Sequence, residues 1–382
     1  MKLGDIGTFT KGAPLSKADI SEKGTPFILY GELYTTYDEV TYEIKRKTDK
    51  IVSETYYSKI GDVIIPTSGE TPEEIATATC VMLPDVILAG DLNIYRTSAV
   101  DGRIVSFIIN HVINDKISKV AQGKSVVHVK AEEIGKISIN YPNAKEQKKI
   151  LSFLELLDKK IDKQKQLVES LKSYKRGVLS AVFSRKIRFK NKDGNAFPEW
   201  TSVRFSGLYK QVSEKNDGSF GTDKIISVAN MYFKSDVTIG SDEYLKSYNI
   251  CRLGDIAFEG NKSKNYSFGR LVENSIGDGI VSHVFIVFRP LNPNHNINYW
   301  KIAINYEPIM GKILAKCTKK STMMTDLVPK DFLLQSILVP CFEEQQRIAD
   351  YISIIDRKID FEVSLLNDLL AQKSEFLRQL FI

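Results

Sequence analysis

Apolar residues recur with alternating spacings of four and three along two long segments of the chain, within residues 143–184 and 341–382. They fill eight of the ten repeating positions in each segment. This spacing is typical of a coiled-coil seam, which places one apolar stripe along a helix. We therefore predict a long helix over each segment, roughly 60 Å long at 1.5 Å per residue. The seam is expected to comprise Ile150, Leu154, Leu157, Ile161, Val168, Leu171, Ile348, Ile352, Ile355, Ile359, Leu366 and Leu369.

The two helical segments are near copies of one another. Residues 142–183 align with residues 340–381 without a gap, so equivalent positions stand 198 residues apart. An internal repeat of this length predicts two copies of a globular domain, each followed by one long helix. Two such units in tandem can pack around a pseudo-two-fold axis, which makes the helices antiparallel. The alternative is that each helix packs only on its own globular domain.

Two polar positions interrupt each apolar stripe at the same places in the repeat. Gln164 matches Glu362, and Lys175 matches Lys373. If Lys175 faces Glu362 in an antiparallel pair, symmetry makes Gln164 face Lys373, and no charge stays unpaired in the seam. We predict this register for the helix pair.

The segments outside the helices, 1–142 and 201–340, are predicted to be similar mixed α/β domains. A charged and then turn-rich stretch at 185–200 indicates a linker. Short apolar runs separated by loops rich in Gly, Ser and Asn predict strands, at 26–30, 62–65, 104–109, 136–140, 224–228, 280–288 and 336–339. The predicted fold is α/β (α+β), with two such domains joined by two long antiparallel helices in a pseudo-two-fold arrangement.

The two globular domains share a framework but differ in their loops. Gly61-Asp62 of the first domain matches Gly254-Asp255 of the second, each after an apolar residue. The helices are much closer copies than the domains. We infer that the helices do the same job twice, while the domains recognise two different targets.

The composition indicates a globular protein of a reducing cytoplasm. Hydrophobic residues make up 43% of the 382 residues, and no apolar stretch approaches the roughly 18–20 residues of a membrane span. The first residues have no signal-peptide core. Cys80, Cys251, Cys317 and Cys341 are scattered without a CxxC pair, which argues against structural zinc and disulfides. We expect a cytoplasmic protein without membrane contacts.

Charge is distributed unevenly along the chain. Residues 1–144 carry 16 Lys and Arg against 19 Asp and Glu, whereas residues 145–192 carry 15 against 5. Any contact of the globular domains with a polyanion must therefore come from local basic loops. The basic tract at 185–190 could contact DNA phosphates or form a solvated, partner-facing linker, and we favour the linker.

Sequence motifs that are typical of catalytic sites are incomplete or absent in this chain. The Gly-Lys-Ser tripeptide at 123–125 ends like a P-loop, but Ser118 stands where the first glycine is required. Glu43 and Lys45 imitate part of a nuclease site, in a triplet that is common in charged chains. The four histidines lack metal-binding spacing, and neither a Gly-x-Ser-x-Gly motif nor an adenine-methyltransferase motif set is present. We expect a binding module without a catalytic or metal site.

The chain resembles the specificity subunits of type I restriction-modification enzymes over essentially its whole length. The resemblance rests on LGDIGTFTKG at 3–12, FPEW at 197–200, the two Gly-Asp motifs and the Pro-x3-Glu-Gln-x2-Ile opening of both repeat helices. Each motif is weak alone, but their duplicated arrangement is specific. Such proteins usually have an FPEW-like lead-in before the first domain as well, whereas this sequence begins at Met1. We expect either that the true start is internal or that a few residues were lost, which concerns the N-terminal edge of the first domain and not the function.

The resemblance implies a DNA-binding subunit that catalyses nothing and holds no cofactor. Each globular domain would be a target-recognition domain that reads one half of a split, asymmetric site in double-stranded DNA. The helices would set the half-site spacing and dock two modification subunits, which are adenine-N6 methyltransferases that bind S-adenosylmethionine. Restriction subunits, which translocate DNA with ATP and Mg, would join the complex.

Two loops in each domain are the best candidates for DNA contacts, because phosphate and base recognition need basic, amide and hydroxyl side chains. They are 67–72 and 119–125 in the first domain, and 260–270 and 316–322 in the second. The alternative for each loop is an ordinary solvated turn. The predicted DNA-binding residues are Ser68, Thr71, Lys119, Gln122, Lys124, Ser125, Asn261, Lys262, Lys264, Asn265, Tyr266, Arg270, Lys319 and Lys320.

Two other functions fit parts of the sequence. A protein-interaction adaptor could use the intramolecular coiled coil to bring partners together. A nuclease or methyltransferase with an unrecognised site is a third possibility. A neighbouring reading frame for an adenine methyltransferase would favour the specificity subunit over the adaptor.

Overall fold

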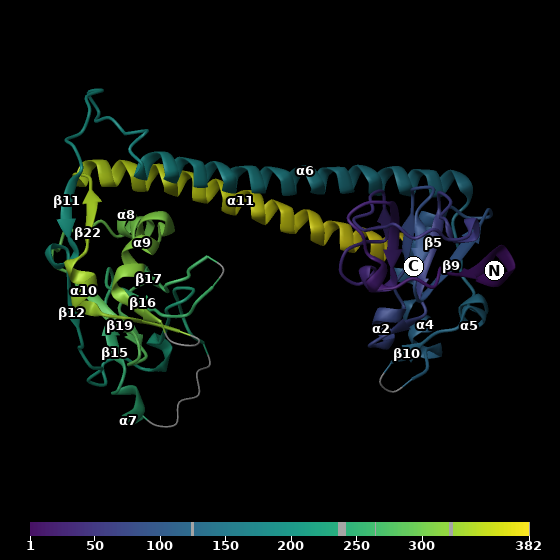
Figure 1. The fold of residues 1–382 in the computed structure, drawn as a ribbon, viewed down its shortest axis with the longest axis horizontal. Helices are drawn as coiled ribbons and strands as arrows, with labels where there is room; N and C mark the ends of the chain where they lie inside the picture. The colour runs from purple at the N-terminus through teal and green to yellow at the C-terminus, as the bar shows by residue number, and fades with distance from the viewer. Residues whose placement is uncertain (124–125, 236–241, 264, 321–323, 382) are drawn as a thin grey trace. The chain divides into compact units, whose positions relative to one another are not determined.

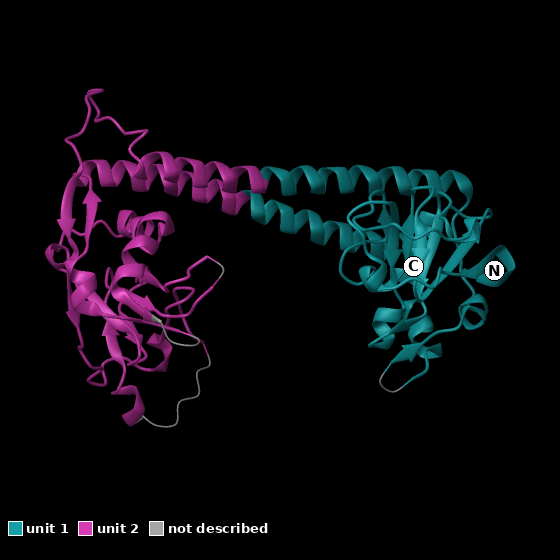
Figure 2. Ribbon diagram, viewed as in Figure 1, with its two compact units in different colours: residues 1–167, 362–382 teal, residues 168–361 magenta. Residues whose placement is uncertain are grey.

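The computed structural model describes residues 1–123, 126–235, 242–263, 265–320 and 324–381. These residues form two compact units (Figure 2), a first unit of Met1–Leu167 with Glu362–Ile382 and a second unit of Val168–Phe361. Two long helices, α6 (Ala144–Phe183) and α11 (Phe342–Leu380), each contribute residues to both units (Figure 1). Each unit therefore contains a mixed α/β body and part of both helices.

The body of the first unit is a set of small sheets covered by short helices. Its strands are β1 (Gly7–Lys11), β2 (Thr25–Leu29), β3 (Val40–Thr41), β4 (Lys47–Thr48), β5 (Asp62–Pro66), β6 (Ser68–Gly69), β7 (Thr79–Val81), β8 (Ile87–Ala89), β9 (Leu92–Thr97) and β10 (Val127–His128). Its short helices are α1 (Leu3–Ile6), α2 (Pro72–Ile75), α3 (Gly102–His111), α4 (Asn114–Val120) and α5 (Ala131–Gly135).

A five-stranded sheet in the order β1-β9-β5-β7-β3 carries the core of the first unit. Strand β5 is buried along its whole length, and α3 packs on β5 and β7 with an apolar face. Leu151 and Leu154 of α6 and Leu377 of α11 belong to the same apolar cluster. Burial of this shared cluster anchors both long helices to the sheet of the first unit.

The second unit repeats this plan with a four-stranded antiparallel sheet in the order β12-β19-β16-β17, whose bounds are β12 (Tyr209–Val212), β19 (Ile286–Pro290), β16 (Ile256–Glu259) and β17 (Arg270–Glu273). Its other strands are β11 (Thr201–Arg204), β13 (Ile226–Ser227), β14 (Tyr232–Phe233), β15 (Asn249–Cys251), β18 (Gly279–Val281), β20 (Thr318–Lys320), β21 (Thr325–Leu327) and β22 (Ser336–Val339). Its short helices are α7 (Asp242–Leu245), α8 (Ile297–Ala303), α9 (Glu307–Cys317) and α10 (Pro329–Leu334). Val182 and Phe183 of α6 and Ile348 of α11 lie in its core.

Three of the predicted strands differ from the structure. Residues 104–109 form most of α3, because the Asp101 side chain accepts a hydrogen bond from the backbone N–H of Arg103 and caps a helix there. A short apolar run does not distinguish a buried strand from a buried helix. Residues 136–140 form only a single bridge between Lys2 and Ser138. Residues 280–288 form the end of β18 and the start of β19, with a turn between them.

The long helices pack together in antiparallel fashion, as predicted. In the first unit, Leu157 and Ile161 of α6 share an apolar cluster with Leu369 of α11, and Phe153 meets Phe376 edge to face at 5.0 Å between ring centroids. Residue numbers fall along α11 as they rise along α6. All twelve predicted seam residues are buried or half-buried.

The predicted register of the helix pair is wrong. Gln164 donates from Nε2 to Oε2 of Glu362 (2.6 Å), its own equivalent in the repeat. In the first unit, Lys373 pairs with Asp158 (2.8 Å), and in the second, Lys175 pairs with the equivalent Asp356 (2.5 Å). The prediction failed because it considered only seam residues, whereas each lysine reaches a carboxylate beside the seam of the opposite helix.

Candidate nucleic-acid interface

The Gly-Asp motifs shared by the two domains have a structural role. Gly61 and Gly254 have φ values of +92° and +85°, a conformation that suits glycine. In the first unit, the buried Asp62 accepts hydrogen bonds from the Arg96 guanidinium at 2.9 and 2.8 Å and from a backbone N–H of the same turn. The turn and β9 are thereby locked together.

The second unit contains the same lock. Asp255 accepts from Arg289 at 3.0 and 2.9 Å, and burial raises the pKa of Asp255 despite the adjacent guanidinium. Glu214 also pairs with Arg289 (2.6 Å). The bonds from Arg252 and Arg289 lower the pKa of Glu214 to about 2. The sequence motif marked these aspartates but not their arginines, although the Asp–Arg spacing of 34 residues is the same in both domains.

The Glu-Gln pair at the start of each repeat helix organises the chain before the helix. Gln147 donates to the carbonyl of Pro142 (2.8 Å), and Gln345 donates in the same way to Pro340 (3.0 Å). These bonds explain the fixed distance between the proline and the Glu-Gln pair. The motif therefore shapes the entry of the chain into each helix.

The linker is tied to the second unit through Glu344, which is fully buried. Its carboxylate accepts from the indole N–H of Trp200 (3.0 Å) and from the Arg188 guanidinium (2.9 Å). Trp200 ends the FPEW motif, and Arg188 belongs to the basic tract at 185–190. Arg188 thus makes a structural contact within its own unit, which favours the linker interpretation of this tract.

The structure brings together the two candidate loops of the first domain. Strand β6 pairs with β10 so that Gly69 faces Val127 and Ser68 faces His128. Ser68 and Thr71 come from one loop, and Gln122 precedes β10 in the other. Residues almost sixty positions apart in the sequence therefore form one surface.

The candidate side chains on this surface differ in availability. Ser68 is buried, and its hydroxyl lies 3.0 Å from Oδ2 of Asp91. The Thr71 hydroxyl caps α2 by accepting from the backbone N–H of Glu74 (3.2 Å). Lys119 and Gln122 are exposed and remain candidates for DNA contacts. The predicted Lys124 and Ser125 lie outside the described residues.

The second unit joins its two candidate loops in the same way. Asn261 forms a bridge with Met324, and Thr325 donates through its backbone N–H (2.9 Å) and its hydroxyl (3.0 Å) to the carbonyl of Gly260. Lys319 is exposed on β20, which pairs with β21. The predicted Lys264 and the side chain of the predicted Lys320 lie outside the part of the chain that the structure describes.

Arg270 is held inside its loop. Its Nε donates to Glu259 at 2.6 Å, and its guanidinium lies 5.0 Å from the centre of the Tyr266 ring. These contacts make Arg270 a support for the loop. Asn261, Lys262 and Asn265 are exposed beside it and remain candidates.

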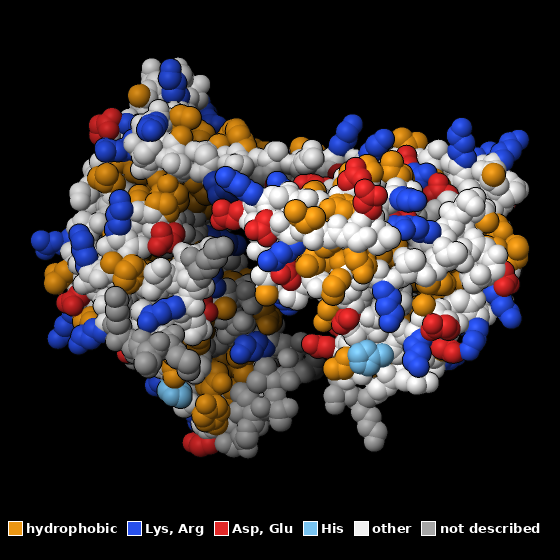
Figure 3. Space-filling view, turned by 45° about the vertical axis from the view of Figure 1, so that its right-hand side comes forward, with side chains coloured by type: hydrophobic (Ala, Val, Ile, Leu, Met, Phe, Trp, Pro, Cys, Tyr) orange, Lys and Arg blue, Asp and Glu red, His pale blue; other side chains and the backbone are white. Residues whose placement is uncertain are grey.

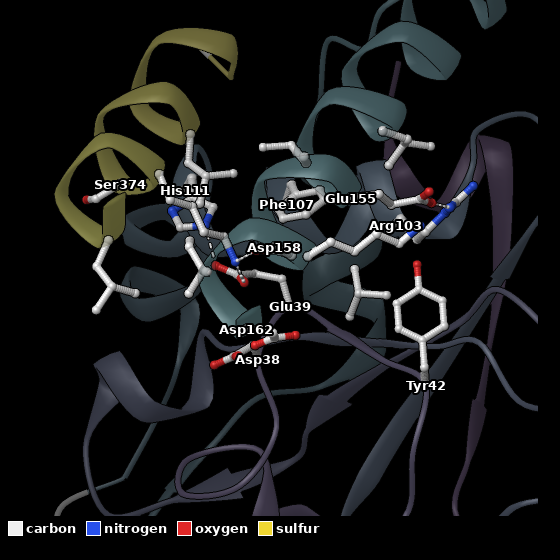
Figure 4. A pocket seen from close by; sticks show the side chains of 18 of the residues that line it. Asp38, Glu39, Tyr42, Arg103, Phe107, His111, Glu155, Asp158, Asp162 and Ser374 are labelled. Atoms are coloured by element: carbon white, nitrogen blue, oxygen red, sulfur yellow. Dashed lines mark hydrogen bonds and ion pairs between the residues drawn. The ribbon is translucent and has the colours of Figure 1, made fainter. Parts of the chain in front are cut away.

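A cavity of about 660 Å³ lies between α3, α6 and α11 in the first unit (Figure 4). Charged side chains that line this cavity connect the body of the unit to α11. Lys373 of α11 lies 2.8 Å from Asp158 and 3.9 Å from Glu39, and Glu39 meets His111 at 2.8 Å. Burial opposes ionisation of Glu39, but the hydrogen bond from His111 and the charge of Lys373 hold its pKa below the ordinary value. This network fixes the sheet of the first unit to the helix pair.

A buried polar cluster in the second unit lies away from the candidate loops. Glu273 is 1% exposed, and Nε2 of His295 lies 3.3 Å from its Oε1. Neither oxygen of Glu273 has a hydrogen-bond partner among the described residues. Burial raises the pKa of Glu273 to about 10 and lowers that of His295 to about 4. Both groups are therefore neutral at pH 7.

The remaining surface features limit the possible functions. Acidic and basic side chains are interspersed over the first unit on the face shown in Figure 3. Within the described part of the chain, no group of three or more His, Cys, Asp or Glu could hold a metal ion. No described helix has both the length and the apolar character needed to cross a membrane.

Comparisons with known proteins identify the fold. The chain is similar to the S subunit of a type I restriction-modification system from M. genitalium, with a TM-score of 0.56 and 13% identity over 100% of this chain and 95% of that chain. It is also similar to a chain from a structure concerning complex assembly and conformational transition of the type I R-M system (TM-score 0.61, 14% identity, 100% and 96% covered). The chain is similar to the HsdS subunit from Thermoanaerobacter tengcongensis as well, with a TM-score of 0.52 and 14% identity over 100% of this chain and 94% of that chain.

The sequence comparison identifies the family. No curated protein sequence matches the chain. The profile of the type I restriction modification DNA specificity domain matches residues 1–173 and 206–371, which is most of the chain. The profile thus covers both globular bodies and most of both long helices. The chain therefore belongs to the type I restriction-modification specificity subunits, the non-catalytic component that gives such a complex its DNA specificity.

Proposed function

We propose that each unit reads one half of a bipartite, asymmetric site in double-stranded DNA. The observation that carries this proposal is the construction of the two candidate surfaces. Each joins the loop after the strand that follows the Gly-Asp motif, β5 or β16, to a loop some sixty residues further on, at Gly69–Val127 in one unit and Asn261–Met324 in the other. The framework is shared, but the exposed side chains differ. Two recognition domains with the same framework but different exposed side chains would recognise two different half-sites.

The paired helices set the spacing between the half-sites and dock two modification subunits. The repeat duplicates exposed residues that helix pairing does not explain. Leu156 is 67% exposed and its equivalent Ile354 is 56% exposed. Lys160 and Lys358 repeat one turn later and are also exposed. Two equal apolar and basic surfaces suit two copies of one partner, an adenine-N6 methyltransferase that binds S-adenosylmethionine.

The larger complex supplies all the chemistry in this proposal. The methyltransferase copies methylate adenines in the recognised site, and restriction subunits with ATP and Mg translocate the DNA. The chain itself determines which DNA sequence the complex recognises. Deleting it should therefore abolish methylation at one sequence motif without affecting motifs that depend on other enzymes.

Methylome sequencing of the host with and without the intact chain tests this proposal. We expect one split motif with N6-methyladenine in both halves to disappear on deletion and to return on complementation. Persistence of every split motif would instead favour the protein-interaction adaptor. A methyltransferase variant without activity serves as a control, because it should erase the same motif.

A further inference from the structure

A groove of about 1250 Å³ opens beside the β6–β10 pair of the first unit. Its lining comes from segments 11–18, 29–31, 90–93 and 128–132 and from Thr67. The backbone N–H of Val129 donates to the carbonyl of Thr67 at 3.1 Å, which ties the groove to the candidate reading loop. All of these elements belong to one unit, and the groove is continuous with the predicted DNA-binding surface.

Three lysines surround this groove. Lys11, Lys17 and Lys130 are exposed, and none of them forms an ion pair with another described residue. The groove also contains Asp91, which accepts from the Ser68 hydroxyl, and Glu132. Because residues 1–144 carry more acidic than basic side chains, three unpaired lysines at one groove are a local positive site in a domain of opposite net charge.

One of the residues that line the groove, Asn93, has an unsatisfied side-chain amide. Asn93 is 1% exposed, and its Nδ2 has no hydrogen-bond partner among the described residues. It faces Lys11 in the register of β1 and β9. A buried donor without an acceptor destabilises a folded protein, and such groups in native structures call for an explanation. A ligand with acceptor oxygens would provide one.

The second unit shows that the fold does not require this amide. Arg96 and Arg289 occupy equivalent positions in the Gly-Asp locks, so the residues three positions earlier, Asn93 and Ile286, are also equivalent. An apolar side chain therefore occupies this position on the same framework. The asparagine is a specific feature of the first unit.

We propose that this groove binds the sugar-phosphate backbone of the DNA beside the half-site read by the first unit. Lys11, Lys17 and Lys130 contact phosphate oxygens, and the Asn93 amide donates to an oxygen of the same strand. The proposal rests on the DNA-reading function proposed above and deepens it, because it separates a positioning groove from the loops that read bases. Backbone contacts fix the register of the protein on the duplex.

The triple variant Lys11→Gln, Lys17→Gln, Lys130→Gln tests the phosphate contacts. Binding of the full chain with its methyltransferase subunits to a duplex carrying the methylated motif is followed by fluorescence anisotropy at several salt concentrations. We expect at least about tenfold weaker binding, and a slope of log K against log salt that is shallower by about 0.9 for each lost phosphate contact. The matched control, Lys23→Gln, Lys50→Gln, Lys116→Gln, removes exposed lysines outside the groove and should bind like the wild type.

Asn93→Ile tests the amide with the residue that the second unit uses. We expect a folded protein that is at least as stable as the wild type, because an unsatisfied donor is removed, yet binds the motif severalfold more weakly. If the groove variants bind DNA like the control, or lose the methyltransferase subunits while retaining DNA binding, the groove proposal is wrong. Failure of the wild-type complex to prefer the motif over a scrambled duplex is a separate result that overturns the reading function and the groove proposal together.

Discussion

The residues that sequence inspection marked most clearly, the Gly-Asp motifs, proved to be internal supports. Asp62 and Asp255 lock a turn to an arginine on a neighbouring strand, and Glu344 holds Trp200 and Arg188. The motifs could be found from the sequence because they are repeated. Their partners could not, because a side-chain pair separated by 34 residues depends on how the strands are paired.

The two locks differ in a way that predicts unequal stability effects. Arg289 keeps Glu214 as a second carboxylate at 2.6 Å, whereas Asp62 is the only carboxylate that pairs with Arg96 among the described residues. Breaking a buried pair by removing one partner costs about 3–5 kcal/mol. We expect Asp62→Asn to reduce the free energy of unfolding by about 3 kcal/mol and Asp255→Asn by less, as measured by chemical denaturation. The exposed control Asp49→Asn should stay within about 0.5 kcal/mol of the wild type, and equal effects of the two lock variants would contradict this account.

Glu273 predicts a pH dependence of stability. Its pKa is about 10 in the folded state against an ordinary value of 4.5, so the folded state keeps a proton that the unfolded state releases. Stability therefore falls as the pH rises between these values, by at most about 1.4 kcal/mol per pH unit. Glu273→Gln has no such proton. Its unfolding free energy relative to the wild type should increase from pH 5 to pH 9 in chemical denaturation, and a difference that does not change with pH would refute the assignment of a neutral Glu273.

At the scale of elements, periodicity predicted the long helices but not their register. The seam pattern predicts which face of each long helix is buried, and the repeat predicts that the two helices pair symmetrically. Neither shows that Asp158 and Asp356, which flank the seam, accept the lysines of the opposite helix. In the same way, the apolar run in α3 carried no period that separates strand from helix, and the capping Asp101 was the available signal.

The exposed apolar residues of the helices predict a partner stoichiometry. Leu156 and Ile354 occupy equivalent repeat positions, and each would lie at one of two equal docking surfaces. We expect Leu156→Glu or Ile354→Glu to leave one methyltransferase subunit bound and the double variant to leave none, as measured by native mass spectrometry. Leu370→Glu is a matched control, because Leu370 is 41% exposed but its repeat equivalent is Lys172. Loss of both subunits from a single variant would contradict two independent surfaces.

At the scale of the whole molecule, the duplicated plan could be predicted from the sequence, whereas the candidate surfaces could be predicted only as separate loops. The repeat established two domains and two helices before any strand was assigned. The β6–β10 pair and the Asn261–Met324 bridge then joined loops whose sequences share no pattern. The groove at Asn93 had no sequence signal, because an isolated asparagine in a strand becomes informative only when its burial and missing partner are known.

The length of the helix pair predicts the spacing between the two half-sites. Gln164 and Glu362 bond to each other at the symmetry centre of the repeat, so one heptad inserted after Gln164 and one before Glu362 preserves the flanking ion pairs of Lys175 and Lys373. The pair then grows by about 10 Å at 1.5 Å per residue. That length corresponds to at most about three base pairs at 3.4 Å each. Methylome sequencing should show a motif with a longer spacer and unchanged half-sites, and a heptad inserted into one helix alone should abolish methylation because the seam falls out of register. An unchanged spacer length in the double insertion, or altered half-sites, would show that the helices do not set the distance between the readers.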